Sequence, residues 1–527
     1  MRLLRVLGVI VSLGASLVCV CACGSDGDAA SNSAGSGGSD AGGSDAGSGG
    51  TVDDAGSDAS WPNTDAGDGA AGTAQDASDA PIPDAEPSDA PPDPCTGIEP
   101  QTDPAANHAT ITQCLEAVGH AILAAGDFPI HTTINMPNGA TLGGDASWPR
   151  LHLTGGAQSV VSTFDDNEVK FLRLDSDHNL TVPHGGVVMI RGNDSFIHDN
   201  HVQCGDGAVG EEKDTGIRFS NTDSRNNRVF NNQIHHVHYG VIFDTYPAGA
   251  VNTLEANQIF EIRCDAVTFR GYGEAIGNDI RHGGWQCLNP STSPIPGGGF
   301  YSLENDAGAR IVDNHVYEVC GMPLDIDRVS GFEIKGNTFE NPGWNWDGHN
   351  ACGAGATAHL VDFRDSVIEN NVFRNDGRHT VSGDPNHVLS ATGSGVPSDL
   401  PSGTNQAVAF MLTHRASSTT WLTTGNAIQD NTFIAGCSAP CVGLGYFVGR
   451  ETGFAADGSW SAQTTNYFRR NTPFGSNIGS KRCGGNWYAA DSTCTAGSLD
   501  VDCNVDDPQH EGAGHDWARN DECSHYQ

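Results

Sequence analysis

Carboxylates and arginines recur at matching places in six short segments of the chain. The segments are residues 216–220 (GIRFS), 240–244 (GVIFD), 266–270 (AVTFR), 300–304 (FYSLE), 323–327 (PLDID) and 360–364 (LVDFR). Their polar and apolar residues alternate with a period of two, which predicts β-strands that send successive side chains to opposite faces. If the segments stack in register, the outward side chains form two columns. One column is Arg218, Ile242, Thr268, Ser302, Asp325 and Asp362, and the other is Ser220, Asp244, Arg270, Glu304, Asp327 and Arg364. The same register places Tyr301, Leu303, Val361 and Phe363 among the inward side chains.

Two kinds of chemistry are available to these columns. Glu304, Asp325 and Asp327 would lie within one repeat of each other. Their mutual repulsion would raise the pKa of one carboxyl and create an acid–base pair, or the set would hold Ca²⁺. Arg270, between Asp244 and Glu304, would clamp the carboxylate of an acidic substrate. The alternative is a solvated ladder of ion pairs that contributes little to the stability of the fold.

Long insertions precede three of these strands, at residues 283–296, 341–356 and 375–405. Loops of this length next to a charged face are common walls of binding sites. They carry Trp285, Trp344 and Trp346, whose aromatic faces suit stacking on sugar rings. The alternative is that these tryptophans anchor only their own loops.

From the two columns and the loops, we predict Arg270, Asp325 and Asp327 as catalytic residues. The predicted substrate-binding residues are Asp244, Glu304, Asp362, Arg364, Trp285, Trp344 and Trp346.

A repeated unit must position these strands. An apolar residue, Asn and a second large apolar residue recur at Ile311, Asn314 and Val316 and again at Ile334, Asn337 and Phe339. Further copies are centred on Asn200, Asn232, Asn257, Asn278, Asn371, Asn431 and Asn471. The shortest spacing, roughly 21–25 residues, predicts a solenoid of strand-rich coils with insertions. Asn suits a tight bend, because it tolerates left-handed dihedral angles and its amide satisfies backbone groups; stacked amides would form a ladder.

From residue 130 to residue 474 these repeats resemble the right-handed parallel β-helix superfamily, the pectate-lyase-like group. The resemblance implies an all-β solenoid fold, and in lyases of this group an Arg or Lys serves as base. The same fold carries lyases, hydrolases, epimerases and non-enzymatic surface proteins, so it does not define a reaction. Residues 108–125 have apolar residues at helical spacing, which predicts an N-terminal helix that caps the open end of the solenoid.

The termini predict export to the cell surface. Residues 1–23 combine Arg2 and Arg5 with an apolar stretch too short to span a bilayer, which is typical of a signal peptide. The sequence around Cys23 resembles a bacterial lipobox, which implies acylation of Cys23; free secretion is the alternative. Residues 24–94 contain many Asp and no Lys or Arg, and predict a disordered, extended tether. The remaining expected parts are an N-terminal cap (95–130), the β-helix (131–475) and a Cys-rich C-terminal cap (476–527).

Charge and cysteine content restrict the partners. The formal net charge is −39, so nucleic acid is excluded as a partner and a polyanionic glycan needs bridging cations or a local basic patch. Thirteen of the 16 cysteines follow residue 23, an odd number that predicts disulfides and at least one free thiol. We expect pairs between Cys95 and Cys114 and between Cys437 and Cys441.

Two other motifs suggest metal binding. His236 and His238 would share a strand face, and Asp500, Asp502, Asn504 and Asp506 have the spacing of a Ca²⁺ loop in which Val505 replaces the turn glycine. A polar bend is the alternative for the histidines.

Together the features predict a monomeric, lipid-anchored envelope protein that acts on extracellular polysaccharide. The reaction is β-elimination of a uronate-containing glycan or hydrolysis by an Asp pair, and the rival is a non-catalytic glycan-binding or structural surface module.

Overall fold

A computed structural model describes much of the chain after residue 92. The described residues are 93–182, 185–205, 214–220, 224–244, 251–284, 297–340, 356–375, 406–413, 425–435, 442–448, 466–469, 471–474, 478–482 and 515–516. Several sequence-based expectations fall outside these residues. They concern the signal and nearly all of the tether, Cys23, the three loop tryptophans, the Cys437–Cys441 pair, the Asp500–Asp506 motif and most of the C-terminal cap.

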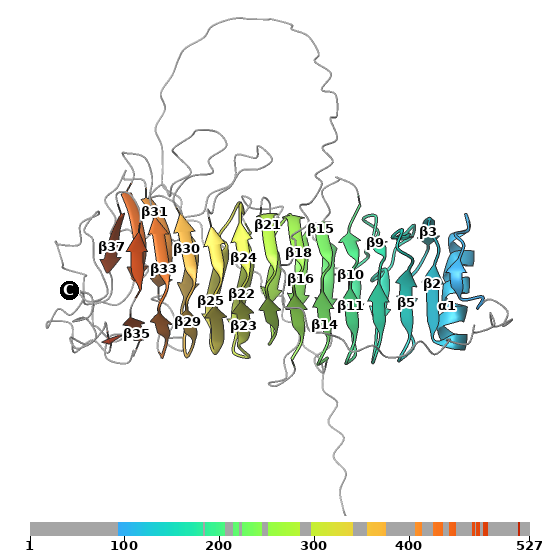
Figure 1. The fold of residues 1–527 in the computed structure, drawn as a ribbon, viewed down its shortest axis with the longest axis horizontal. Coiled ribbons are helices and arrows are strands. Elements are labelled where there is room, and N and C mark those ends of the chain that lie inside the picture. The colour runs from blue at the N-terminus through green and yellow to red at the C-terminus, as the bar shows by residue number, and fades with distance from the viewer. Residues whose placement is uncertain are drawn as a thin grey trace, which may run out of the picture. The chain divides into compact units, whose positions relative to one another are not determined.

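The described residues form three parallel sheets (Figure 1). Sheet C carries the strands that the sequence analysis singled out. Its 12 strands, in chain order, are β4 (Ile134–Asn135), β7 (Val161–Thr163), β10 (Gly185–Ile190), β13 (Asp214–Phe219), β16 (Tyr239–Phe243), β19 (Val267–Phe269), β22 (Phe300–Asn305), β25 (Leu324–Val329), β28 (Ala356–Val361), β31 (Gln406–Thr413), β34 (Val442–Val448) and β37 (Ile478–Arg482).

Sheet A follows sheet C along each coil. Its 14 strands are β1 (Thr96–Ile98), β2 (His120–Leu123), β5 (Thr141–Gly144), β8 (Glu168–Lys170), β11 (Phe196–His198), β14 (Arg228–Phe230), β17 (Thr253–Glu255), β20 (Glu274–Ile276), β23 (Ala309–Val312), β26 (Phe332–Lys335), β29 (Val367–Glu369), β32 (Ala427–Gln429), β35 (Asn466–Arg469) and β38 (His515–Asp516).

Sheet B completes each coil. Its 12 strands are β3 (Asp127–Ile130), β6 (Arg150–Leu153), β9 (Arg173–Asp175), β12 (His201–Gln203), β15 (Gln233–Val237), β18 (Gln258–Ile262), β21 (Asp279–Gly283), β24 (His315–Tyr317), β27 (Thr338–Glu340), β30 (Val372–Asn375), β33 (Thr432–Ala435) and β36 (Thr472–Phe474). Every strand pairs in parallel with its counterpart one coil away, so the expected right-handed parallel β-helix is confirmed.

The asparagine ladder runs along the bend between sheets A and B. The Asn314 side-chain oxygen accepts hydrogen bonds from the backbone and side-chain amides of Asn278, at 2.9 and 2.8 Å. Asn314 in turn donates from both groups to Asn337, at 2.9 Å each. The same two hydrogen bonds, from the backbone and side-chain amides of one asparagine to the side-chain oxygen of the next, link each pair of neighbours from Asn200 to Asn371. They also join Asn371 to Asn431 and Asn431 to Asn471. The ladder is therefore confirmed.

The left-handed position in this bend is not the asparagine itself. The residue immediately before it has positive φ, for example Asp313 (55°) before Asn314 and Gly336 (65°) before Asn337. Ala256, with φ of 52°, holds this position before Asn257. The division of roles has a physical reason. The residue with positive φ turns the chain, and this leaves the following Asn free to pair its amide along the stack.

The core inside the coils is apolar and stacked. Phe219, Phe243 and Phe269 follow one another in sheet C with ring centroids 4.5 and 5.0 Å apart and nearly parallel planes. All three side chains are fully buried, as are the aliphatic residues that flank them in the same strands. Burial of such columns is the main stabilising contribution in a solenoid, since each coil contacts only its neighbours.

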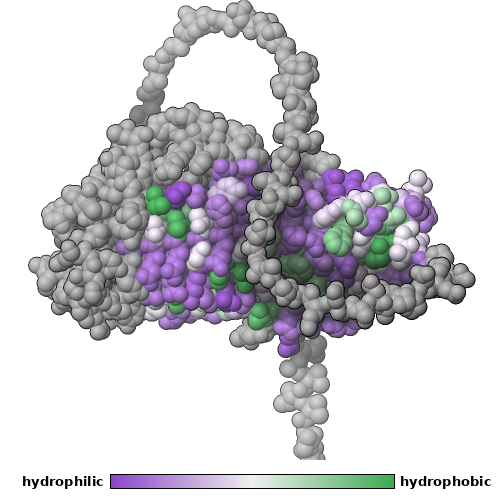
Figure 2. Space-filling model, viewed as in Figure 1, coloured by the Kyte–Doolittle hydropathy of each residue, from purple (hydrophilic) through white to green (hydrophobic). Residues whose placement is uncertain are grey.

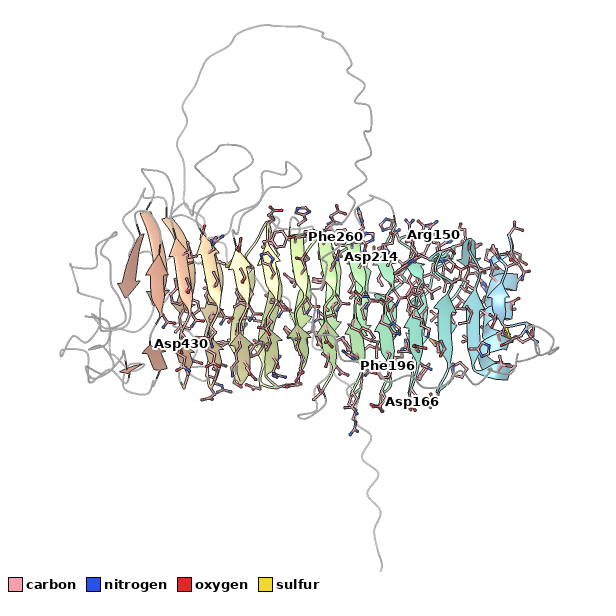
Figure 3. All side chains as sticks on the ribbon, viewed as in Figure 1. Arg150, Asp166, Phe196, Asp214, Phe260 and Asp430 are labelled. Atoms are coloured by element: carbon pink, nitrogen blue, oxygen red, sulfur yellow. A yellow bond between two sulfur atoms is a disulfide. The ribbon has the colours of Figure 1, made fainter. Side chains whose placement is uncertain are left out.

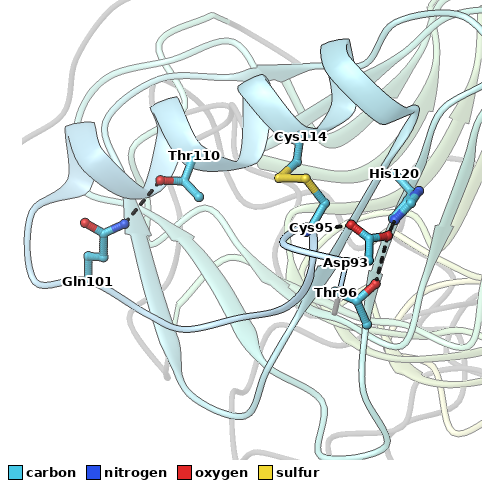
Figure 4. The surroundings of a disulfide bond; sticks show 7 residues. All are labelled: Asp93, Cys95, Thr96, Gln101, Thr110, Cys114 and His120. Atoms are coloured by element: carbon cyan, nitrogen blue, oxygen red, sulfur yellow. Dashed lines mark hydrogen bonds and ion pairs between the residues drawn. A yellow bond between two sulfur atoms is a disulfide. The ribbon is translucent and has the colours of Figure 1, made fainter. Parts of the chain in front are cut away.

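The N-terminal helix α1 spans Pro104–Val118, a different range from the one expected. It begins after the N-cap Asp103 and ends at Gly119, whose φ of 78° is the left-handed conformation that closes a helix. The apolar spacing after Gly119 belongs instead to β2, the second strand of sheet A. The expected Cys95–Cys114 disulfide is present and ties α1 to β1 (Figure 4). Cys264 and Cys320 are also disulfide-bonded, and Cys204 is a buried free thiol.

The surface of the described part is mostly hydrophilic in the view of Figure 2. Its large exposed apolar side chains are few, namely Val118, Phe171, Phe196, Val251 and Leu303. Among the described residues, no helix has the length and apolar character needed to cross a membrane.

Candidate functional site on sheet C

The register of strand β22 differs from the expected one by one residue. Thr268 pairs with Tyr301 and Phe269 pairs with Ser302, so Phe300 and Ser302 point inward and are fully buried. Tyr301 points outward in place of Ser302, and Leu303 is 38% exposed in the place expected for Glu304. The prediction that Tyr301 and Leu303 face the core is therefore wrong. A buried serine hydroxyl is tolerated here because Ser302 donates to the Phe269 carbonyl at 2.8 Å.

Strand β28 is displaced by three residues from the expected alignment. Leu324 pairs with Ala358 and Asp325 pairs with His359, so the strand is residues 356–361 and not 360–364. Asp362 is consequently fully buried, at a corner with φ of 49°, and does not stand beside Asp325. Arg364 lies beyond the strand and forms an ion pair with Asp306 at 2.9 Å. Neither residue belongs to the outward columns that the sequence analysis proposed.

The observed outward column brings together a different set of side chains. Thr268, Tyr301, Asp325 and His359 occupy one register position on strands β19, β22, β25 and β28. Successive strands place these positions about 4.8 Å apart. His359 Nδ1 lies 3.5 Å from Asp325 Oδ1, with the histidine side chain 11% and the aspartate side chain 32% exposed. A carboxylate next to an imidazole orients the ring, an arrangement common around general bases.

Asp265 is a second carboxyl of this region that the sequence analysis missed. It lies just before β19, is 7% exposed, and its Oδ1 accepts a hydrogen bond from the Gly298 backbone at 3.1 Å. Burial raises the pKa of Asp265 to about 7; the Gly298 hydrogen bond opposes this rise and the charge of Asp325 adds to it. A carboxyl with such a pKa exchanges its proton near neutral pH, which suits acid–base catalysis.

Tyr301 stays protonated in this environment. Burial is the main cause that raises its pKa above the usual range, and the negative charges of Asp265, Asp325 and Asp327 add to it. A phenol held in this way is a hydrogen-bond donor and a proton donor rather than a base. The set Tyr301, Asp325, His359 and Asp265 is called the sheet C cluster below.

Arginines flank the cluster on the side of lower residue numbers. Arg218 forms an ion pair with Asp244, and Arg270 lies 3.6 Å from the same carboxylate. The Arg270 side chain is 36% exposed, so it keeps donors available to solvent or to a ligand. The expected proximity of Arg270 and Asp244 is present, whereas the neighbour of Arg270 on β22 is Leu303 and not Glu304.

The three carboxylates expected to hold Ca²⁺ occupy different environments. Asp325 is in the cluster column, and Asp327 is in the next outward column with 7% exposure. Glu304 sits at a corner with φ of 54° and forms an ion pair with Arg328, whose Nε also lies 3.4 Å from Asp327 Oδ1. A cation is thus already placed between Glu304 and Asp327.

The histidines of β15 also lie elsewhere than expected. His236 has φ of 51° and its Nε2 is 3.0 Å from Glu261 Oε2, while His238 is buried with its ring 4.6 Å from that of Tyr239. The neighbour of His236 is His235, and burial, with a contribution from His236, lowers the pKa of His235 to about 4. A sequence signal for His359 exists, because residues 356–361 also alternate, in a register different from that of the predicted strand 360–364.

Comparisons with known proteins add no family assignment. No family model and no curated protein sequence matches the chain. Among solved structures, the chain is similar to the A-module of the mannuronan C-5 epimerase AlgE4 of Azotobacter vinelandii, with 12% identity and a TM-score of 0.43 over 75% of this chain and 96% of that one. It is also similar to the catalytic domain of Agl-KA, with 14% identity and a TM-score of 0.44 over 73% of this chain and 66% of that one. These values carry no information on the reaction, which is therefore argued from the site.

Proposed function

We propose that the protein is an extracytoplasmic enzyme that cleaves uronate-containing polysaccharide by β-elimination at the sheet C cluster. The observation that carries the proposal is the column in which Asp325 stands between Tyr301 and His359. The column supports the proposal because it holds a phenol, a carboxylate and an imidazole on one face of a rigid sheet. Groups on such a frame are better positioned than groups on loops.

The reaction needs three contributions from the protein. A base removes the proton on the carbon next to the uronate carboxylate, an acid protonates the glycosidic oxygen as its bond to the ring breaks, and a cation neutralises the carboxylate. We assign the base to His359, oriented by Asp325, and the acid to Tyr301. Arg270 binds the carboxylate, which is a suitable role for a half-exposed guanidinium in a protein with a net negative charge. The products are a new non-reducing end with a double bond and a new reducing end.

The experiment is a screen of uronate glycans that follows the ultraviolet absorbance of the unsaturated product and, in parallel, the reducing ends. Each assay is run with and without Ca²⁺, which tests whether the reaction depends on a divalent cation. Tyr301→Phe and His359→Gln are expected to lower the rate by about 10²–10⁴-fold. The matched controls are Tyr317→Phe and His315→Gln, which change a tyrosine and a histidine on sheet B. They should leave the rate unchanged.

A full rate in either sheet C variant would overturn the assignment of that residue. If both variants keep the rate, the cluster is not the active site. Binding of glycan without any new chain ends would show a non-catalytic binding module instead of an enzyme.

Hydrolysis is the second candidate, and the raised pKa of Asp265 favours it. Glycosidases pair a carboxylic acid of raised pKa with a second carboxylate, and in this alternative Asp265 is the acid and Asp325 the second carboxylate. The two reactions leave different products. Reducing ends without ultraviolet absorbance, together with loss of activity in Asp265→Asn, would establish hydrolysis and exclude the elimination.

A further inference from the structure

The corner between sheets B and C contains a column of residues with positive φ. His236, Glu261, His282 and Glu318 have φ between 51° and 55° and occupy the same place in four successive coils. On either side of this place the strands pair normally, with His235 opposite Phe260 and Val237 opposite Ile262. The kinked position therefore projects its side chains from the corner in a stack that alternates imidazole and carboxylate.

Three donor side chains converge at the start of this column. His236 Nε2 lies 3.0 Å from Glu261 Oε2, and His236 Nδ1 lies 2.7 Å from His235 Nδ1. One possible ligand atom from each of the three residues lies within 4.8 Å of the others. Two ligands of one Zn²⁺ ion, at 2.0–2.1 Å from it in tetrahedral geometry, are about 3.3 Å apart. His236 directs Nε2 toward Glu261 and Nδ1 toward His235, and one Zn²⁺ ion takes only one of these nitrogens. We therefore expect the side chains of His236 and Glu261 to rotate when the ion binds.

The ring of His235 is held in place by its surroundings. It stacks on the ring of Phe260, with centroids 4.9 Å apart and planes inclined by 13°, and the ring of His201 meets it edge-on at 6.4 Å. Phe260, which is labelled in Figure 3, is the central residue of β18. A fixed imidazole loses little side-chain entropy when it binds a ligand, which favours a preorganised site.

We propose that His235, His236 and Glu261 form a binding site for a first-row transition metal ion, with Zn²⁺ as the probe. Two imidazoles and one carboxylate are a donor set that suits Zn²⁺ and related ions, whereas Ca²⁺ and Mg²⁺ prefer oxygen donors throughout. Three protein ligands leave a coordination position open for water or for a group of a ligand. Among the described residues this is the group of His, Cys, Asp and Glu side chains that meets the geometric requirement. The proposal is independent of the reaction proposed for sheet C.

The test is a calorimetric titration of the intact protein with Zn²⁺, in wild type and in variants that preserve the corner. His236→Asn removes the imidazole and keeps a residue that tolerates positive φ. Glu261→Gln removes the charge and keeps the shape. His315→Asn is the control, since His315 is a half-exposed histidine on the same sheet and lies outside the group. We expect one Zn²⁺ site in wild type and in the control, and at least a tenfold weaker Kd in the other two variants.

Melting temperatures measured in a chelator identify any variant that fails to fold, and the remaining variant then carries the comparison. Excess Ca²⁺ should not displace Zn²⁺ from the wild-type protein. The proposal is overturned if wild type binds no Zn²⁺, if His236→Asn and Glu261→Gln bind it as wild type does, or if Ca²⁺ competes on equal terms. Unchanged binding in both variants would assign Zn²⁺ to other histidines of the chain.

Discussion

At the scale of single residues, the feature with the clearest consequence is the buried carboxyl of Asp265. Its proton is retained because ionisation in a site that is 7% exposed would leave a charge with little solvation. The Gly298 amide satisfies one oxygen, so the neutral acid is not an unsatisfied group. A neutral acid next to Asp325 also avoids the repulsion of two adjacent negative charges.

This buried acid makes the stability of the protein depend on pH. The folded-state pKa of Asp265 is about 7, above the ordinary aspartate value of 3.8, so the folded state holds the proton over a range where the unfolded state has lost it. The resulting stabilisation is complete below about pH 4 and is lost as the pH rises to about 7. The difference in free energy of unfolding between wild type and Asp265→Asn should fall by about 4 kcal/mol across this range.

Denaturant unfolding at several pH values measures this difference. Asp166→Asn is the matched control, because Asp166 is exposed and its φ of 56° suits Asn. Its difference from wild type should not vary with pH. A difference for Asp265→Asn that is equally flat would contradict the raised pKa.

At the scale of elements, the asparagine ladder connects neighbouring coils by side-chain hydrogen bonds. Each interior amide is almost fully buried and both donates and accepts, so one substitution leaves groups unpaired in two coils. Unpaired buried groups cost more than the hydrogen bond itself contributes. The ladder is thus expected to be sensitive to substitution along its whole length.

Asn314→Ala tests this expectation. It removes the acceptor of two amides of Asn278, together with the donor to the Ala275 carbonyl at 2.8 Å. We expect a loss of about 1–3 kcal/mol in the free energy of unfolding. Asn135→Ala, at an exposed position of strand β4, should change it by less than about 0.5 kcal/mol. Equal melting temperatures for the two variants would show that the ladder does not stabilise the coils.

At the scale of the whole molecule, the chain combines a long acidic solenoid with an N-terminal sequence suited to anchoring. We propose that residues 1–23 direct export and that Cys23 carries a lipid, with residues 24–94 as a spacer between the envelope and the solenoid. The composition of the spacer supports this, since it holds many aspartates and no basic residue and would remain extended through repulsion. An anchored enzyme of this kind would act on polymers outside the cell.

Substitution Cys23→Ser should move the protein from the membrane fraction to the soluble fraction of expressing cells. The physical reason is that acyl chains supply the membrane affinity, about 0.8 kcal/mol for each buried methylene. Mass spectrometry of the mature N-terminus checks the modification directly. Wild-type protein that is soluble and carries no acyl group would exclude the anchor.

The sequence by itself determined the repeat, the strand content and the asparagine ladder. These features depend on local patterns, because the same apolar and Asn spacing recurs in each coil and each coil needs only its neighbours. It also predicted correctly that Arg270 lies near Asp244, since their strands belong to successive coils that both follow the repeat.

Only the tertiary structure decided the composition of the sheet C cluster. Residues 285–296 and 341–355 interrupt the repeat before β22 and β28, and an alternating strand fits its pattern equally well after a shift. The hydrogen bonds between coils resolved this ambiguity, replacing Ser302 by Tyr301 and Asp362 by His359 next to Asp325. The meeting of His236 with Glu261 likewise depends on coil stacking and on a kinked corner whose dihedral angles no sequence period reveals.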